Sequence, residues 1–275
     1  MIIEFTKMNG AGNDFVVIDC MTEPIAFDTD QIAFLCDRKR GIGADGILLL
    51  EPDPAHDFRM RYYNRDGGEA GMCGNGARCL AHIAANRGLG VADGEARKII
   101  FTTNAGTMKA RVTGNRVALE MSDAFDLSLN LSLQVENRDE IVHFINTGVP
   151  HVVMNLTEVD TLEDDYINSY GNTLRNNPRF LPEGCNVNFA SCIQNGSIQI
   201  RTYERGVEQE TLACGTGAVA TAIIFGHLGL ALPPVRLLTR GGDDLSVSFS
   251  LDTGGAREVV LDGPAKVNFN GTITI

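Results

Sequence analysis

The chain has 275 residues, of which 44% are hydrophobic, and its formal net charge is -12 at pH 7. This length and apolar content suit one large globular domain or two smaller ones. The negative charge, with 23 Lys and Arg residues scattered along the chain, argues against a nucleic-acid partner. Because the sequence has no N-terminal signal pattern and no run of about 18 apolar residues, we expect a cytoplasmic protein without membrane attachment.

Strands dominate the elements predicted for the first half of the chain. A helix is predicted near 30–38, capped by Thr29 or Asp30, and a second helix follows residue 73. Strands are predicted over 2–8, 15–19, 47–50, 57–64, 98–103, 106–112 and 115–121.

The second half repeats this composition. Helices are predicted near 163–170 and after residue 214, which leaves strands far in the majority and indicates an α+β type of α/β protein. Strands are predicted over 141–146, 151–155, 185–193, 197–204, 235–239, 244–250, 257–262 and 265–274.

A repeated motif, Cys-Gly-x-Gly-Ala, occurs at 73–77 and at 214–218. The similarity extends upstream, where "RYYNRDGG" (61–68) matches "RTYERGVE" (201–208). Two homologous half-domains are the simplest explanation. We predict a half-domain over 1–118 that carries Cys73 and is completed by 264–275, and a second over 119–263 that carries Cys214.

Each repeated Cys is predicted to lie where a loop enters a helix. A helix start has unpaired N–H groups and a partial positive charge, so it can hold a carboxylate and lower the pKa of a thiol. If the half-domains pack about a pseudo-two-fold axis, Cys73 and Cys214 would lie on opposite sides of one ligand. Two opposed acid/base groups suit the inversion of a stereocentre.

A plainer interpretation is that the glycines allow tight helix packing and that each Cys is a small buried residue. Two copies in matching contexts favour the chemical interpretation. The other cysteines are expected to be free thiols, most of them buried in the core, since an odd set without Cys-x-x-Cys argues against disulfides and a structural metal. They are Cys20, Cys36, Cys79, Cys185 and Cys192.

Other candidates have competing interpretations. The segment "GIGADG" (41–46) precedes a strand instead of opening a helix, so it is not a dinucleotide-binding fingerprint. Asn13 could be a site residue or part of an Asx-turn. His151 could serve the site or only hydrogen-bond at a strand end. Asn64 and Glu204 occupy equivalent repeat positions, where a difference suits an asymmetric substrate.

Six segments together resemble the diaminopimelate epimerases: "KMNGAGNDFVVID", "GIGADGILL", "YYNRDGGEAGMCGNGARC", "GVPHVV", "NVNF" and "RTYERGVEQETLACGTGA". The resemblance implies two pseudo-symmetric domains, each an antiparallel-rich sheet curled around a central helix, with the active site in the interdomain cleft. It also implies cofactor-independent interconversion of LL- and meso-2,6-diaminopimelate, which supplies lysine and peptidoglycan precursors.

Site residues follow from the same resemblance. Cys73 and Cys214 would be the acid/base pair, and His151 and Glu204 would support catalysis. Substrate would be bound by Asn13, Asn64, Gly74, Asn75, Asn186, Glu204, Arg205, Gly215 and Thr216. Two positions depart from the family: some members carry Gln in place of Gly46 and Asn in place of Val149, so these two side-chain contacts to substrate are missing.

Two other functions remain open from the sequence. A thiol hydrolase would use one Cys with His151 as its base. A non-catalytic amino-acid-binding protein would use the helix starts to hold a carboxylate. In each case the expected partner is a small molecule, without nucleic acid, membrane or cofactor, and the oligomeric state stays open between monomer and homodimer.

Overall fold

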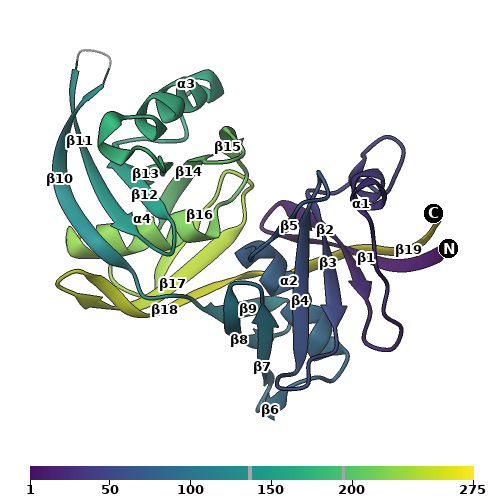
Figure 1. Ribbon diagram of the computed structural model, residues 1–275. Coiled ribbons are helices and arrows are strands. Elements are labelled where there is room, and N and C mark those ends of the chain that lie inside the picture. The colour runs from purple at the N-terminus through teal and green to yellow at the C-terminus, as the bar shows by residue number, and fades with distance from the viewer. Residues whose placement is uncertain (136–137, 194–195) are drawn as a thin grey trace. The chain divides into compact units, whose positions relative to one another are not determined.

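The computed structural model describes residues 1–135, 138–193 and 196–275 (Figure 1). The chain divides into two compact units. Unit 1 comprises Met1–Leu119 and Gly263–Ile275, and unit 2 comprises Glu120–Asp262. Within the described residues the protein is a mixed α/β structure of many strands and four α-helices, which confirms the predicted fold class.

Unit 1 is a mixed sheet with two helices. The strands follow one another in the order β19-β1-β2-β3-β4-β7-β8-β9, with β5 beside β4 and β6 beside β7. The elements are β1 (Ile2–Gly10), β2 (Asn13–Asp19), α1 (Thr29–Cys36), β3 (Gly46–Glu51), β4 (Phe58–Asn64), β5 (Glu69–Ala70), α2 (Gly74–Asn86), β6 (Val91–Asp93), β7 (Ala96–Thr103), β8 (Gly106–Thr113), β9 (Arg116–Glu120) and β19 (Lys266–Thr274).

Unit 2 has the same design. Its strands follow the order β10-β11-β12-β13-β14-β16-β17-β18, with β15 beside β14. The elements are β10 (Phe125–Val135), β11 (Arg138–Asn146), β12 (Pro150–Asn155), α3 (Asp164–Arg175), the 3₁₀ turn η1 (Pro178–Phe180), β13 (Asn186–Cys192), β14 (Ile198–Glu204), β15 (Gln209–Thr211), α4 (Gly215–His227), β16 (Val235–Leu238), β17 (Asp244–Asp252) and β18 (Gly255–Pro264).

The internal repeat is visible in the strand pairing. In unit 1, β2 is parallel to β3 and β4 is parallel to β7, whereas the other pairs are antiparallel. In unit 2, β12 is parallel to β13 and β14 is parallel to β16. The registers correspond as well, because Tyr63 lies opposite Ile47 and Tyr203 opposite Val187. The sequence repeat is therefore a repeat of topology.

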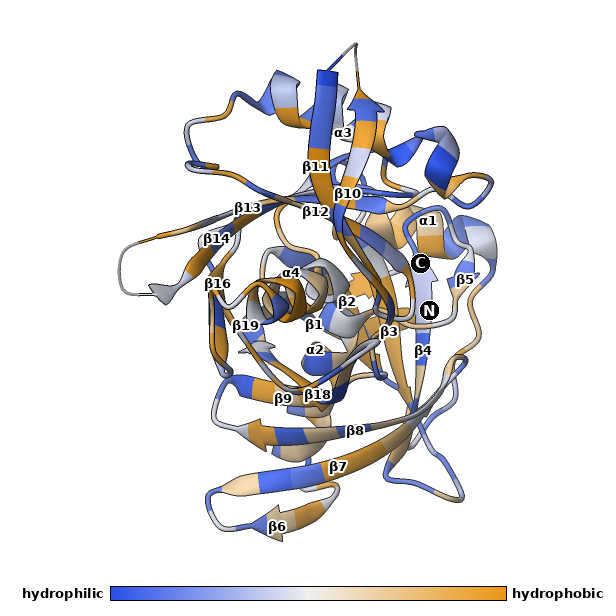
Figure 2. Cartoon of the chain, turned by 90° about the vertical axis from the view of Figure 1, so that its left-hand side faces the viewer, coloured by the Kyte–Doolittle hydropathy of each residue, from blue (hydrophilic) through white to orange (hydrophobic). Residues whose placement is uncertain are grey.

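Each sheet has a helix on both faces. The inner helix α2 contacts six strands from β1 to β8, and α4 contacts six from β11 to β17. Figure 2 shows the largely hydrophobic α4 among the strands of unit 2. The helix α1 closes a core with β1–β4 in unit 1, and α3 closes one with β10–β14 in unit 2. Because α2 and α4 are the buried centres of their units, their starts are held rigidly.

The structure differs from the sequence-based prediction at the cap of α1, at the long strand β10 and at the short strands β5, β6 and β15, which were not predicted. The cap of α1 is Asp28, not Thr29 or Asp30, and forms a capping box with Gln31: Asp28 Oδ1 accepts from the Gln31 N–H at 2.8 Å and Gln31 Oε1 accepts from the Asp28 N–H at 3.0 Å. The strand β10 was not predicted, although its leucines alternate with polar residues over 127–133. The remaining helices and long strands lie where predicted. In the described part of the chain, no helix has the length and apolar character to cross a membrane.

Candidate functional site

The repeated cysteines are the N-caps of the two inner helices, as predicted. Cys73 has φ -138° and ψ 119°, and Cys214 has φ -117° and ψ 114°, so both lie in the extended region just before a helix of 13 residues. The backbone oxygens accept the first helical hydrogen bonds, from the Ala77 N–H at 2.8 Å and the Ala218 N–H at 2.9 Å. Neither thiol forms a capping hydrogen bond with the first turn of its helix.

The other five cysteines have a different environment. Burial raises the pKa of Cys36 to about 11 and the pKa of Cys79 and Cys185 to about 12. Burial also raises the pKa of Cys20 and of the more exposed Cys192. These thiols stay protonated near neutral pH and are poor bases. Burial thus disfavours acid/base chemistry at the five cysteines outside the repeated motif.

The glycines of the repeated motif differ in how closely their neighbours approach. A Cβ at Gly74 would meet nothing within 4 Å, so the first turn of α2 faces open space there. A Cβ at Gly76 would lie 2.9 Å from Leu48 Cδ2, and one at Gly217 would lie 2.3 Å from Asn188 Oδ1. The second glycine of the motif therefore allows the helix to approach the sheet, which supports the packing interpretation for that position alone.

In unit 1, Asn13 is the side chain that meets the repeated cysteine. Cys73 Sγ lies 3.6 Å from Asn13 Oδ1, and Asn13 Nδ2 donates to Asp45 Oδ2 at 2.7 Å. Asn75, the second residue of α2, is buried, and its Oδ1 accepts from Arg78 at 2.7 Å. Asn64 is exposed at the end of β4, in the turn that leads to Cys73.

A charged cluster stands behind Asn13. Asp14 accepts a bidentate pair of hydrogen bonds from Arg38, at 3.0 and 2.6 Å, and another from Lys7 Nζ at 2.6 Å. Burial raises the pKa of Asp14, but the hydrogen bonds from Arg38 and Lys7 outweigh burial and bring it down to about 2. Arg38 also donates to Asp45 Oδ1 at 2.9 Å. Asp14 is thus a permanent anion that holds these cations in place.

In unit 2, the repeated cysteine meets a hydroxyl group. Cys214 Sγ lies 3.4 Å from Thr216 Oγ1, on the second residue of α4. Thr147 Oγ1 donates to the backbone oxygen of Thr216 at 3.3 Å. Glu204, at the end of β14, accepts from Thr211 Oγ1 at 2.9 Å, and burial raises the pKa of its carboxyl group. A carboxyl group with a raised pKa can donate as well as accept hydrogen bonds.

His151 is fully buried in unit 2, and its neighbours fix its proton. Asn188 Nδ2 donates to the Val152 backbone oxygen at 2.9 Å, so this NH₂ group also faces His151 Nδ1, at 3.1 Å. The Asn188 oxygen accepts from Thr202 Oγ1 at 3.0 Å. Nδ1 has the shorter of the two ring contacts with amide NH₂ groups, 3.1 Å to Asn188 against 3.5 Å to Asn186, so Nδ1 is the better acceptor and the proton of the neutral ring is assigned to Nε2. Burial, aided by the charge of Arg205, lowers the pKa of His151 to about 3.

The Nε2–H group of His151 has a second donor beside it. Asn186 Nδ2 lies 3.5 Å from Nε2, while Asn186 Oδ1 accepts from the Arg205 backbone N–H at 2.9 Å. Two adjacent N–H donors suit an acceptor such as a carboxylate oxygen. His151 is thus arranged as a hydrogen-bond donor and not as a base.

The strand registers show which residues of the two units are equivalent. Gly46 lies opposite Phe15 and Asn64 in unit 1, and Asn186 lies opposite His151 in unit 2. The polar residues of unit 2 therefore replace mostly apolar ones of unit 1. The equivalent pairs are Phe15 with His151, Gly46 with Asn186, Leu48 with Asn188, Tyr62 with Thr202, and Asn64 with Glu204.

The candidate site residues fall into two sets, one in each unit. Three further residues form hydrogen bonds that position members of these sets, and the sequence analysis did not predict them: Asp45, Asn188 and Thr202. A usable signal existed for Asn188, since Asn186 and Asn188 place two amides on one face of a buried strand. The sets are Asn13, Asn64, Gly74 and Asn75 with Cys73, and His151, Asn186, Glu204, Arg205, Gly215 and Thr216 with Cys214.

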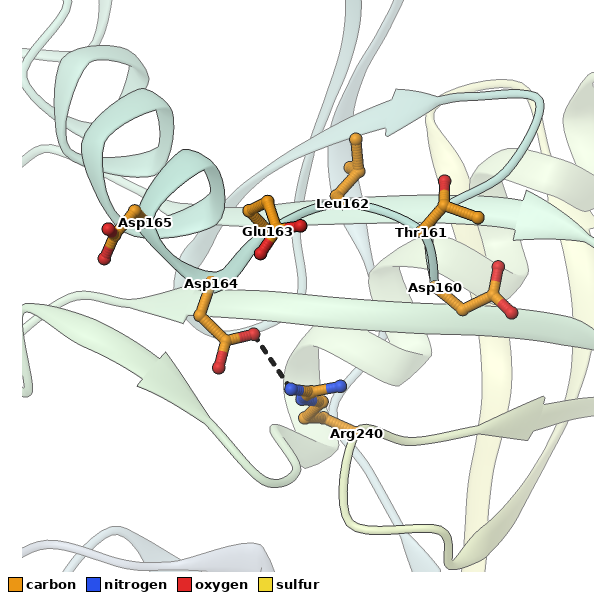
Figure 3. Close-up of a pocket in the computed structure, with 7 residues that line it drawn as sticks. All are labelled: Asp160, Thr161, Leu162, Glu163, Asp164, Asp165 and Arg240. Carbon is orange, nitrogen blue, oxygen red and sulfur yellow. Dashed lines mark hydrogen bonds and ion pairs between the residues drawn. The ribbon is translucent and has the colours of Figure 1, made fainter.

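A separate pocket of about 420 Å³ lies on unit 2 and contains none of the candidate residues (Figure 3). The Asp164 carboxylate in this pocket forms an ion pair with Arg240 at 2.8 Å. It forms a second ion pair with the buried Arg201 at 2.6 Å. The other lining residues of the pocket are Asp160, Thr161, Leu162, Glu163 and Asp165. These ion pairs anchor the start of α3, which is a structural role.

Solved structures share the fold of this chain. A probable proline racemase from Agrobacterium radiobacter K84 superposes with a TM-score of 0.73 at 16% identity, covering 99% of this chain and 92% of the other. A phenazine biosynthesis protein of the PhzF family from Bacillus anthracis superposes with a TM-score of 0.72 at 12% identity and covers 100% of both chains. At such identities the likeness shows the fold alone.

Sequence comparison identifies the family. The model of the diaminopimelate epimerase family matches residues 5–125 and 143–267. The diaminopimelate epimerase of Aquifex aeolicus (strain VF5) is 39% identical over 285 residues, covering 99% of this chain and 98% of that protein. The diaminopimelate epimerase of Chlorobaculum tepidum is 39% identical over 275 residues, covering 98% and 100%. The chain therefore belongs to the diaminopimelate epimerase family.

Proposed function

We propose that this chain interconverts LL- and meso-2,6-diaminopimelate without a cofactor, using Cys73 and Cys214 as its two acid/base groups. The observation that carries the proposal is the pair of cysteine N-caps on two equivalent buried helices. Their matching backbone geometry, in a chain of this family, supports a matched pair of chemical roles.

The mechanism requires the two thiols to act on opposite faces of one α-carbon. One thiolate removes the α-proton, and the other thiol delivers a proton to the opposite face. Negative charge grows on the substrate carboxylate as the proton leaves, and N–H groups of a helix start stabilise that charge. The roles of the two cysteines exchange when the reaction runs in reverse.

The remaining residues would bind and orient the substrate. The first turns of the inner helices, with Gly74 and Asn75 in α2 and Gly215 and Thr216 in α4, would hold the carboxylate at the reacting centre. The Nε2–H group of His151 would donate a hydrogen bond to an acceptor oxygen. The distal amino-acid end would be bound chiefly by Asn13, Asn64, Asn186, Glu204 and Arg205.

Proton NMR of diaminopimelate in deuterated buffer tests the proposal. The wild type should exchange the α-proton of one stereocentre while LL- and meso-isomers interconvert, whereas Cys73→Ala and Cys214→Ala should each lose epimerisation by several orders of magnitude. Cys192→Ala, which removes an exposed thiol outside the motifs, is the matched control and should keep its activity. Full turnover by either motif variant would refute the proposal.

The two alternatives from the sequence gain no support from the geometry. A thiol hydrolase would need His151 as its base, but burial lowers the pKa of this group to about 3, which makes it a weak base. A protein that only binds an amino acid predicts no exchange of the α-proton in the same NMR experiment. That experiment therefore separates catalysis from binding.

A further inference from the structure

Asn13 can present either end of its side-chain amide to the Cys73 thiol, and the two ends have opposite effects. The oxygen accepts a hydrogen bond from S–H and so stabilises the protonated thiol. The nitrogen donates and so stabilises the thiolate. In this structure the oxygen faces Cys73, at 3.6 Å from Sγ. The orientation of one amide thus bears on which form of the thiol is favoured.

Asp45 fixes that orientation. Its Oδ2 accepts from Asn13 Nδ2 at 2.7 Å. If the amide were reversed, the Asn13 oxygen would face this carboxylate, which has no hydrogen to donate. Asp45 is itself held, because Oδ1 accepts from Arg38 at 2.9 Å and Oδ2 accepts from the Asp14 backbone N–H at 3.2 Å. The Asp45 carboxylate therefore cannot turn away from Asn13 without also losing its hydrogen bonds to Arg38 and the Asp14 N–H.

The segment 41–46, which is not a nucleotide-binding fingerprint, explains how Asp45 reaches this position. Gly41 and Gly43 let the chain fold back against the end of α1: a Cβ at Gly41 would lie 1.9 Å from the Phe34 oxygen, and Gly43 has φ +80°. The Asp45 N–H then donates to the Asp14 backbone oxygen at 2.9 Å. The backbone oxygen of Gly43 accepts from Lys7 Nζ. The charged groups behind Asn13 therefore come from β1, β2, the turn after α1 and the start of β3.

We propose that Asp45 is a positioning residue that orients the Asn13 amide so that its oxygen, and not its nitrogen, faces the Cys73 thiol. Asp45 acts through Asn13 and favours the protonated form of Cys73. At Cys214 the contact to Thr216 Oγ1, at 3.4 Å, is with a hydroxyl, which can accept from a thiol or donate to a thiolate. The catalytic meaning of a protonated Cys73 rests on the proposed function.

The orientation can be measured without substrate. Alkylation by iodoacetamide as a function of pH, followed at the Cys73 peptide by mass spectrometry, gives the pH midpoint of this thiol. In Asp45→Ala the amide is free to turn its N–H groups toward sulfur, so we expect the midpoint to fall by about one pH unit and the alkylation rate below the midpoint to rise about tenfold. The Cys214 midpoint, read from its own peptide, should stay unchanged.

A double-mutant cycle separates this effect from the plain loss of a nearby negative charge. In an Asn13→Leu background, Asp45→Ala should leave the midpoint unchanged, because no amide remains to be oriented. Asp14→Asn removes a neighbouring charge but not the anchor of Asn13, so its shift should be much smaller. An equal shift from Asp45→Ala with and without Asn13, or from Asp14→Asn, would overturn the proposal.

A measurement on the wild type keeps the proposal testable if Asp45→Ala does not fold. The Asn13 side-chain NH₂ should exchange slowly with solvent in amide NMR spectra, because one of its protons is held by Asp45. Rapid exchange would contradict the anchored amide. The alkylation midpoint and the exchange of the Asn13 NH₂ group are both measured without epimerisation. The proposal on Asp45 can therefore fail while the proposed function holds, and the proposed function can fail while the proposal on Asp45 holds.

Discussion

At the scale of single residues, the two units differ at the equivalent positions of Phe15 and His151. The same point of the same topology carries an apolar ring in unit 1 and a buried imidazole in unit 2. In unit 2 the imidazole contacts Asn188, and the equivalent position in unit 1 is Leu48. A buried polar pair of this kind costs stability unless every group is satisfied, so its presence in one unit alone indicates a function.

We expect His151 to make the protein less stable in acid. The pKa of His151 is about 3 in the folded protein, against an ordinary value of 6.5. Between these values the unfolded chain binds a proton that the folded chain does not, so the free energy of unfolding falls as pH drops from about 6.5 toward 3, by up to about 1.4 kcal/mol per pH unit. The contribution of neutral His151 to the free energy of unfolding is fully present above about pH 6.5.

Urea unfolding across this pH range measures the effect. The variant His151→Phe with Asn188→Leu, which carries the unit 1 residues, should have a flatter dependence of unfolding free energy on pH. Thr202→Val is the control, since it removes the hydroxyl that donates to Asn188 but no titrating group. It should lower stability at every pH and leave the slope intact. An unchanged slope in the double variant would contradict the role given to His151.

At the scale of elements, Gly217 in α4 and Gly74 in α2 should respond differently to alanine. Gly217→Ala would place a Cβ 2.3 Å from Asn188 Oδ1, so α4 or its sheet must shift, and we expect a loss of about 1–3 kcal/mol in unfolding free energy. Gly74→Ala meets open space and should be neutral or slightly stabilising. Thermal unfolding of the two variants checks the contrast, and equal losses would show that the contacts of Gly217 do not matter.

Sequence patterns predicted most elements because hydrophobic periodicity is a local property. The inner helices and their cysteine N-caps follow from the repeat itself. The cap of α1 was wrong by one or two residues because Asp28, Thr29 and Asp30 are all good caps, and only the reciprocal bond with Gln31 distinguishes them. Asp45 and Asn188 were missed because their partners, Asn13 and His151, are distant in sequence and adjacent only across the sheet.

At the scale of the whole molecule, the chain of unit 1 is discontinuous. It starts with β1 and is completed by β19, whose residues pair with β1 from Thr274 opposite Ile2 to Lys266 opposite Asn9. Phe5 and Phe269 add an edge-to-face ring contact at 6.0 Å. Because β1 also covers α2, the last strand supports the element that begins at Cys73.

Removal of residues 266–275 should therefore loosen unit 1 selectively. The truncation keeps Pro264, whose backbone oxygen accepts from Arg78 at 3.3 Å, but it strips β1 of one neighbour and exposes its edge. We expect hydrogen–deuterium exchange to rise in β1, β2 and the first turn of α2, while β12–β14 and α4 keep their protection, since unit 2 retains its own core. Deletion of Ile275 alone removes its backbone pairing with Met1 and its contact with the core beneath α1, so as a comparison it should raise exchange only at the start of β1. If protection were lost equally in α2 and α4, the two units would unfold as one cooperative structure, and Cys73 could not be destabilised without Cys214.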